Sequence, residues 1–110
     1  IMTFTVFPVY IPYIHRSVSS MHLVSIFKSI LGGNFIDKLS MVTRINPVNR
    51  RSYKSVCISF KRFESPPNQI IVDLAEDIKK HPVTWAYQTH SNVRTFDIQV
   101  QERVELNRYC

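Results

Sequence analysis

Basic side chains gather around one tyrosine in the middle of the 110-residue chain. Tyr53 lies among six of them: Arg44, Arg50, Arg51, Lys54, Lys61 and Arg62. Cations can neutralise phosphates and an aromatic ring between them can stack on a base, so this pattern is typical of a surface that follows single-stranded nucleic acid. The same charges can also keep an exposed sheet soluble and protect its edge, and the sequence leaves both interpretations open.

A second aromatic pair, Trp85 and Tyr87, lies two positions apart in the chain. On a strand this spacing places both rings on one face. Large rings arranged in this way can anchor a protein interface, or they can extend the hydrophobic core beside the last strand. The pair is therefore a candidate protein interface, with core packing as the alternative.

The other reactive residue types form no catalytic or metal-binding pattern. The four histidines lack metal-ligand spacing: His15, His22, His81 and His90. The acids Asp73, Glu76 and Asp77 fall on the outer face of an expected helix. No nucleophile elbow, glycine-rich phosphate loop or His-Glu-x-x-His motif occurs. We therefore expect a protein that is not an enzyme, with no catalytic residues, no metal, no cofactor and no small-molecule substrate.

The composition is that of one modest globular domain with a basic surface. Hydrophobic residues make up 45% of the chain, and 14 Lys and Arg against 8 Asp and Glu give a net charge of +6. This surplus favours a polyanionic partner. No apolar run reaches the ~18 residues of a membrane span, and the apolar N-terminal stretch lacks the basic region of a signal peptide. We expect an intracellular protein, in the cytoplasm or nucleus, with no membrane partner.

Periodicity predicts the elements that must position these residues. Helices are expected over 22–31 and 69–80, and strands near 4–11, 37–45, 53–62, 83–88 and 95–101. Pro8 and Pro12 interrupt the first strand pattern, and we expect them to mark a bulge and the strand end. On the third strand, Val56, Ile58 and Phe60 form the apolar face that should lie against the helices.

This order predicts an α+β, ferredoxin-like β-α-β-β-α-β domain with an extra strand or hairpin before the last strand. A four-stranded antiparallel sheet would carry both helices on one face and leave the other face open. A single domain should occupy residues 1–110, with a core over about 4–101 and a tail or strand extension over 102–110.

The same order resembles the RNA-recognition-motif (RRM) family over about residues 4–101. Val9-Tyr10-Ile11-Pro12-Tyr13-Ile14 is similar to the family's first-strand hexamer, with Tyr13 where asparagine is usual. The resemblance implies that Tyr10 presents a ring on the open face for base stacking. Leu23 and Phe27 resemble the Leu-x-x-x-Phe pair of the family's first helix.

The family's second motif is matched in part by the octamer Arg51–Ile58. Arg51, Tyr53 and Val56 fit, whereas both glycines are absent and Ser55 replaces an aromatic residue that usually stacks on a base. The run Ile11-Pro12-Tyr13-Ile14 is also similar to short RRM-like proteins of large DNA viruses. That likeness implies a place in a virus particle or in viral gene expression.

Two functions follow as expectations. The first is binding of single-stranded nucleic acid, RNA rather than DNA, by stacking and phosphate neutralisation on the open face; its site residues are Tyr10, Arg44, Arg51, Tyr53, Lys54 and Lys61. The second is a structural or interaction protein that uses the same face, or Trp85 and Tyr87, to dock on a protein partner, as a minor capsid or virion component would.

Overall fold

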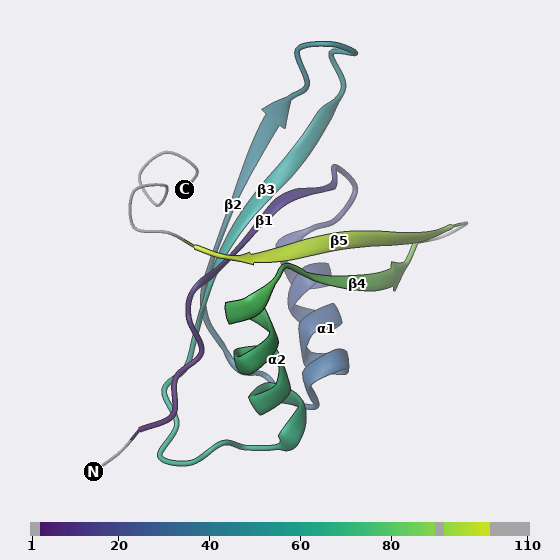
Figure 1. Cartoon of the computed structure of the whole chain (residues 1–110). Coiled ribbons are helices and arrows are strands. Elements are labelled where there is room, and N and C mark those ends of the chain that lie inside the picture. Colours follow the sequence, from purple (N-terminus) through teal and green to yellow (C-terminus); the bar gives the residue numbers. More distant parts are fainter. Residues whose placement is uncertain (1–2, 90–91, 102–110) are drawn as a thin grey trace.

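The computed structural model describes residues 3–89 and 92–101. Strands and helices follow one another as β1 (Val9–His15), α1 (Ser20–Leu31), β2 (Ile36–Ile45), β3 (Ser52–Phe60), α2 (Gln69–Lys80), β4 (Val83–Gln88) and β5 (Val93–Val100). The strands form one antiparallel sheet in the order β2-β3-β1-β5-β4. Figure 1 shows the two helices together on one side of this sheet, with the β2–β3 hairpin projecting beyond it.

The predicted α+β class is confirmed, but the sheet has five strands rather than four. The extra strand β4 continues the sheet because its backbone pairs with β5 from Val83 opposite Ile98 to Gln88 opposite Val93. The expected helix over 69–80 and strand over 83–88 are confirmed at both ends. The predicted tail over 102–110 lies outside the described residues.

The first strand begins later than predicted, at Val9 instead of residue 4. Pro8 has no N–H to donate to a neighbouring strand, and among residues 3–7 only Phe4 pairs, in an isolated bridge with Phe63. The strand end expected near residue 11, at Pro12, is wrong, because β1 continues to His15; Pro12 instead lies at a bulge, where the pairing of β1 with β3 shifts between Ile11 and Ile14. Two residues of β1 therefore stand opposite one residue of β3.

Side-chain caps fix the starts of both 12-residue helices, and a glycine cap fixes the end of α1. Ser19 caps the start of α1, and Gly32 ends it in the left-handed conformation at φ 77°. Asn68 accepts a 2.9 Å hydrogen bond from the N–H of Ile71 and donates one of 2.7 Å to the carbonyl of Leu31, so it ties the start of α2 to the end of α1. In the described part of the chain, no helix is long and apolar enough to cross a membrane.

The core lies between the helices and one face of the sheet. As predicted, Val56, Ile58 and Phe60 of β3 belong to this core, together with apolar side chains of both helices and of β1 and β5. Phe27 of α1 is 1% exposed and its ring contacts those of Phe60, Trp85 and Phe96. Because successive side chains of a strand alternate, the residues between these core positions face the opposite side of the sheet.

Candidate nucleic-acid interface

Two tyrosine rings stack on the sheet face away from the helices. The rings of Tyr13 and Tyr53 have centroids 5.0 Å apart and planes inclined by 27°. The Tyr13 side chain is 55% exposed and that of Tyr53 is half-buried. The pair therefore presents an aromatic surface to solvent on a rigid part of the sheet.

The bulge at Pro12 places Tyr13 on this face. Ile11 pairs with Val56 and Ile14 pairs with Lys54, so Pro12 and Tyr13 together occupy the place opposite Ser55. Without the extra residue, simple alternation would turn Tyr13 toward the helices. The sequence did not identify Tyr13 as a site residue, although the Ile-Pro-x-Ile spacing, with two core isoleucines three apart, is a signal of the bulge.

Ser55 takes the place where an RRM-like strand would carry a stacking ring, and it forms a buried polar junction instead. Its side chain is 0% exposed, and its hydroxyl donates a 2.8 Å hydrogen bond to the carbonyl of Pro12. The same oxygen accepts a 3.0 Å hydrogen bond from Nε of Arg44. Since Arg44 lies directly opposite Tyr53 in the β2–β3 ladder, this junction holds a guanidinium beside the tyrosine pair.

Tyr10 lies on the same face but is only 8% exposed. It stands opposite Cys57, which is 7% exposed. Among the tyrosines of residues 3–89, Tyr13 and Tyr53 therefore offer a surface on this face, and little of the Tyr10 side chain reaches solvent.

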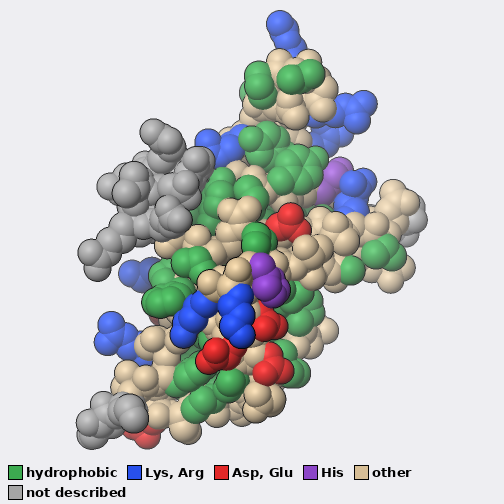
Figure 2. Space-filling model, in the orientation of Figure 1, with side chains coloured by type: hydrophobic (Ala, Val, Ile, Leu, Met, Phe, Trp, Pro, Cys, Tyr) green, Lys and Arg blue, Asp and Glu red, His purple; other side chains and the backbone are tan. Residues whose placement is uncertain are grey.

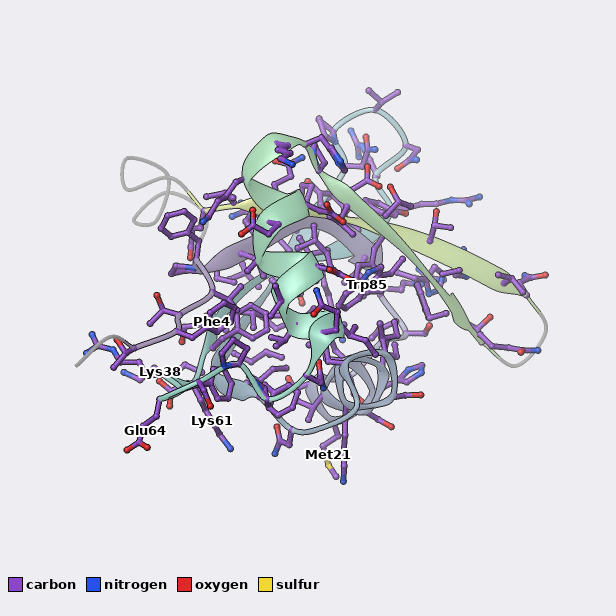
Figure 3. The ribbon with its side chains drawn as sticks, turned by 60° about the horizontal axis from the view of Figure 1, so that its bottom comes forward. Phe4, Met21, Lys38, Lys61, Glu64 and Trp85 are labelled. Atoms are coloured by element: carbon purple, nitrogen blue, oxygen red, sulfur yellow. The ribbon has the colours of Figure 1, made fainter. Side chains whose placement is uncertain are left out.

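The structure does not bring the predicted basic residues into one patch. Lys54 has the same strand parity as Val56, and its Nζ donates a 2.8 Å hydrogen bond to the carbonyl of Val18 on the helix side. Lys61 lies beyond the far end of β3, where its Nζ donates to the carbonyl of Asn34 at 3.2 Å. Figure 3 shows Lys61 near Phe4, far from Trp85 in that view.

Arg50 and Arg51 lie at the exposed turn of the β2–β3 hairpin. The turn is closed by hydrogen bonds from the N–H of Arg50 to the carbonyl of Asn46 and from the N–H of Asn46 to the carbonyl of Arg51. Arg50 adopts a left-handed φ of 59° within it. The backbone is thus fixed while both side chains extend into solvent, and Figure 2 shows Lys and Arg side chains at this projecting end.

The segment 38–63, which contains most of β2 and all of β3, has no Asp or Glu. It carries seven cationic side chains, half of the 14 in the chain: Lys38, Arg44, Arg50, Arg51, Lys54, Lys61 and Arg62. A segment whose only charged side chains are cations produces a positive potential, which attracts a polyanion. Lys54 is next to Tyr53 in the chain, but its side chain lies on the helix side; Arg44 lies directly opposite Tyr53, and Arg50 and Arg51 follow at the hairpin turn.

The candidate interface pair is found in the core instead. Tyr87 is 6% exposed and belongs to the core cluster, while Trp85 is half-buried against it. The Trp85 ring meets the ring of Phe27 edge-on at 4.8 Å, and the Tyr87 ring lies 5.5 Å from that of Phe96. Both side chains lie on the face of β4 that the helices cover, so the structure shows the core-packing alternative. Figure 3 shows Trp85 among the side chains between the ribbons.

No family model, curated protein or solved structure matches this chain.

Proposed function

We propose that the chain is a non-catalytic, RRM-like binding module that takes up single-stranded nucleic acid, RNA rather than DNA. The ligand lies on the sheet face opposite the helices and at the base of the β2–β3 hairpin. The observation that carries this proposal is the stacked pair of exposed Tyr13 and half-buried Tyr53, which lies beside Arg44 of the cationic segment 38–63.

The chemistry of that surface suits an unpaired strand. A base can stack on the outer face of Tyr13, because the other face of that ring is already covered by Tyr53. Arg44, Arg50 and Arg51 can then neutralise the phosphates that follow. Unstacked bases and accessible backbone are features of single strands, and recognition of them through aromatic side chains is the usual mode for RNA.

The strand order also supports the proposal. Four of the strands, β2-β3-β1-β5, have the order of a ferredoxin-like sheet, and β4 extends it at one edge. In this arrangement the central strands β1 and β3 carry Tyr13 and Tyr53. The proposed ligand site therefore spans two neighbouring strands of the sheet, next to the start of β3.

Fluorescence anisotropy with labelled single-stranded RNA, titrated from about 50 to 200 mM salt, tests the proposal. Affinity should fall with salt by ~0.7 log units per log unit of salt for each phosphate contact. The double change Arg50→Gln, Arg51→Gln should flatten the slope by about 1.4, whereas the matched change Lys79→Gln, Lys80→Gln on α2 should leave it unaltered.

The tyrosine pair is tested separately in the same assay. Tyr13→Ala should weaken binding by ~1–3 kcal/mol without changing the salt slope, because stacking releases no counterions. Absence of binding at about 50 mM salt, or equal slopes for the hairpin and α2 variants, would overturn the proposal. A parallel titration with single-stranded DNA tests the preference for RNA.

A protein-binding role is the second candidate, favoured by the apolar residues on the projecting hairpin. Ile45 is 68% exposed and Val48 is 91% exposed. If the hairpin docks on a protein partner, as in a virus particle, the double change Ile45→Ser, Val48→Ser should abolish that association and leave RNA binding intact.

A further inference from the structure

The sheet ends in β2 on one side and in β4 on the other. A strand at the edge of a sheet leaves backbone groups that can pair with another chain, and proteins usually protect such an edge with charged residues, a proline or a bulge. β2 carries Asp37, Lys38 and Arg44, and its pairing with β3 shifts between Ile36 and Lys38. The β2 edge is therefore protected by both charge and irregular pairing.

The β4 edge has none of these protections. Its six residues include no charged residue and no proline, and they pair with β5 from Val83 to Gln88 without a shift in register. Within the described residues, no strand lies on the other side of β4. Two copies of a chain with a net charge of +6 repel each other, so an uncharged edge is a place where they can come into contact.

The hydrogen bonds of the β4–β5 hairpin show which backbone groups face the β4 edge. One step beyond the last pair of the ladder, the N–H of Thr89 donates a 2.8 Å hydrogen bond to the carbonyl of Asn92. Hydrogen-bonded and non-hydrogen-bonded pairs alternate along an antiparallel ladder. Thr84, Ala86 and Gln88 are therefore in non-hydrogen-bonded positions, and their N–H and C=O groups point away from β5. All three residues are exposed.

One side of α1 adds a second uncharged surface beside this edge. A hollow of about 250 Å³ lies between the helix and the strand, lined by His22, Ser25, Ile26, Ser29, Ile30, Ala86, Tyr87 and Gln88. The two serines are exposed and the two isoleucines are half-buried. A stable interface takes about 800 Å² from each partner, which is more than a short strand supplies alone. The α1 side of the hollow can provide part of the remaining area.

We propose that the chain forms a two-fold dimer in which β4 pairs antiparallel with β4 of a second copy, with Ala86 at the axis. In this register Ala86 faces the partner's Ala86, and Thr84 faces the partner's Gln88. The outward N–H and C=O groups of all three residues then form hydrogen bonds, and the two sheets become one. The contact is self-complementary, as a two-fold interface must be.

The side chains also fit this register. Trp85 of one copy lies opposite the partner's Tyr87 on the helix-covered face, and aromatic pairs across an antiparallel ladder stabilise it. The axis is perpendicular to the sheet, so both copies keep their helices on the same face and the two α1 helices approach each other across the axis. The tyrosine pair of the proposed function lies on β1 and β3, so the dimer does not rest on that function, and RNA binding and dimerisation can fail independently.

Sedimentation velocity over the micromolar to millimolar range tests the proposal directly, and we expect a monomer–dimer equilibrium. Ala86 is exposed, so Ala86→Lys and Ala86→Glu should each fold as the natural chain does, which circular dichroism checks. Each variant places two like charges face to face at the axis and should weaken the dimer by about tenfold or more. Thr43→Glu, an equal change of charge on β2, is the control and should dimerise as the natural chain does.

Mixing the two Ala86 variants tests the register itself. If Ala86 faces its own copy, Ala86→Lys and Ala86→Glu together should form a one-to-one heterodimer that neither forms alone, because opposite charges then meet at the axis. Failure of the mixture to associate, although the natural chain dimerises, would overturn the assigned register. Equal dimerisation of the natural chain and both single variants would do the same.

Hydrogen exchange measured by NMR supplies a test that needs no variant. The amides of Thr84, Ala86 and Gln88 should exchange slowly at high protein concentration and rapidly at low concentration, because only the partner strand protects them. A chain that stays monomeric up to the millimolar range, with these amides exchanging rapidly throughout, would overturn the proposal and leave the β4 edge to a strand of another protein.

Discussion

The Ser55 hydroxyl donates a 2.8 Å hydrogen bond to the carbonyl of Pro12. A bulge leaves backbone groups outside the regular ladder, and this carbonyl is one that the strand pairing does not serve. Ser55 thus stabilises the irregularity that turns Tyr13 outward, and it fixes the side chain of Arg44 with the same oxygen. One buried serine links the backbone of β1 to both chemical groups of the proposed interface.

Ser55→Ala should therefore destabilise the domain by ~1–3 kcal/mol, the cost of leaving a buried polar partner unsatisfied. Urea unfolding followed by circular dichroism measures it. Ser59→Ala, on the same strand and face but half-buried, is the control and should change stability by less than about 0.5 kcal/mol. Equal effects at the two serines would contradict the role given to Ser55.

Removing either ring of the β4 pair should destabilise the isolated domain. We expect Trp85→Ala and Tyr87→Ala each to cost ~3–5 kcal/mol, because both rings pack on the core around Phe27 and Phe96. Thermal or urea denaturation measures the loss. Met21→Ala is the matched control, since Met21 is 84% exposed on α1, and Figure 3 shows its side chain projecting outward. A denaturation midpoint unchanged in both aromatic variants would mean that the rings serve an external interface.

Asn68 makes two hydrogen bonds, one to the carbonyl of Leu31 that joins the helices and one that caps α2, and their contributions to stability can be measured separately. Asn68→Ala removes both and should cost ~1–2 kcal/mol. Asn68→Ser keeps an N-cap acceptor but loses the donor to the carbonyl of Leu31. The unfolding free energy of this variant should therefore lie between those of the natural chain and the alanine variant. Identical unfolding free energies for the serine variant and the natural chain would show that the bridge contributes nothing.

His15 should make stability dependent on pH. Its pKa is lowered in the folded chain by burial and by the charges of Arg94 and Arg16, so the unfolded chain binds the proton first as the pH falls. This contribution is fully present above pH 6.5 and is lost as the pH falls from there through the folded-state value. NMR titration of the imidazole measures it. Arg94→Gln should move the pKa of His15 part of the way back, and Arg50→Gln should not move it.

Local periodicity was sufficient to predict most of the elements and the core face of β3. The same reasoning missed the orientation of Lys54, although its even spacing from Val56 and Ile58 places it on the helix side. Tyr13 was missed because alternation with a period of two fails at a bulge. The Ser55 junction with Arg44, and the meeting of Arg94 with the loop after β1, join residues far apart in sequence, and no local pattern encodes such contacts.

The first strand shows how proline sets a boundary that apolar alternation alone does not. The residues before Pro8 alternate as a strand would, yet regular pairing begins only at Val9. Because Pro8 lacks an N–H, the ladder cannot continue through it despite the apolar alternation. The carbonyl of Pro8 still accepts a 2.9 Å hydrogen bond from the N–H of Gln101.

The cationic segment 38–63 also affects how the chain folds. Cations on neighbouring strands repel one another as β2 and β3 come together, and segment 38–63 contains no carboxylate to offset them. Added salt weakens this repulsion, so it should speed closure of the hairpin while it weakens any contact with a polyanion. Higher ionic strength thus favours closure of the β2–β3 hairpin but weakens the binding of a polyanion to it. A bound polyanion would itself reduce the repulsion between the strands and so stabilise the closed hairpin.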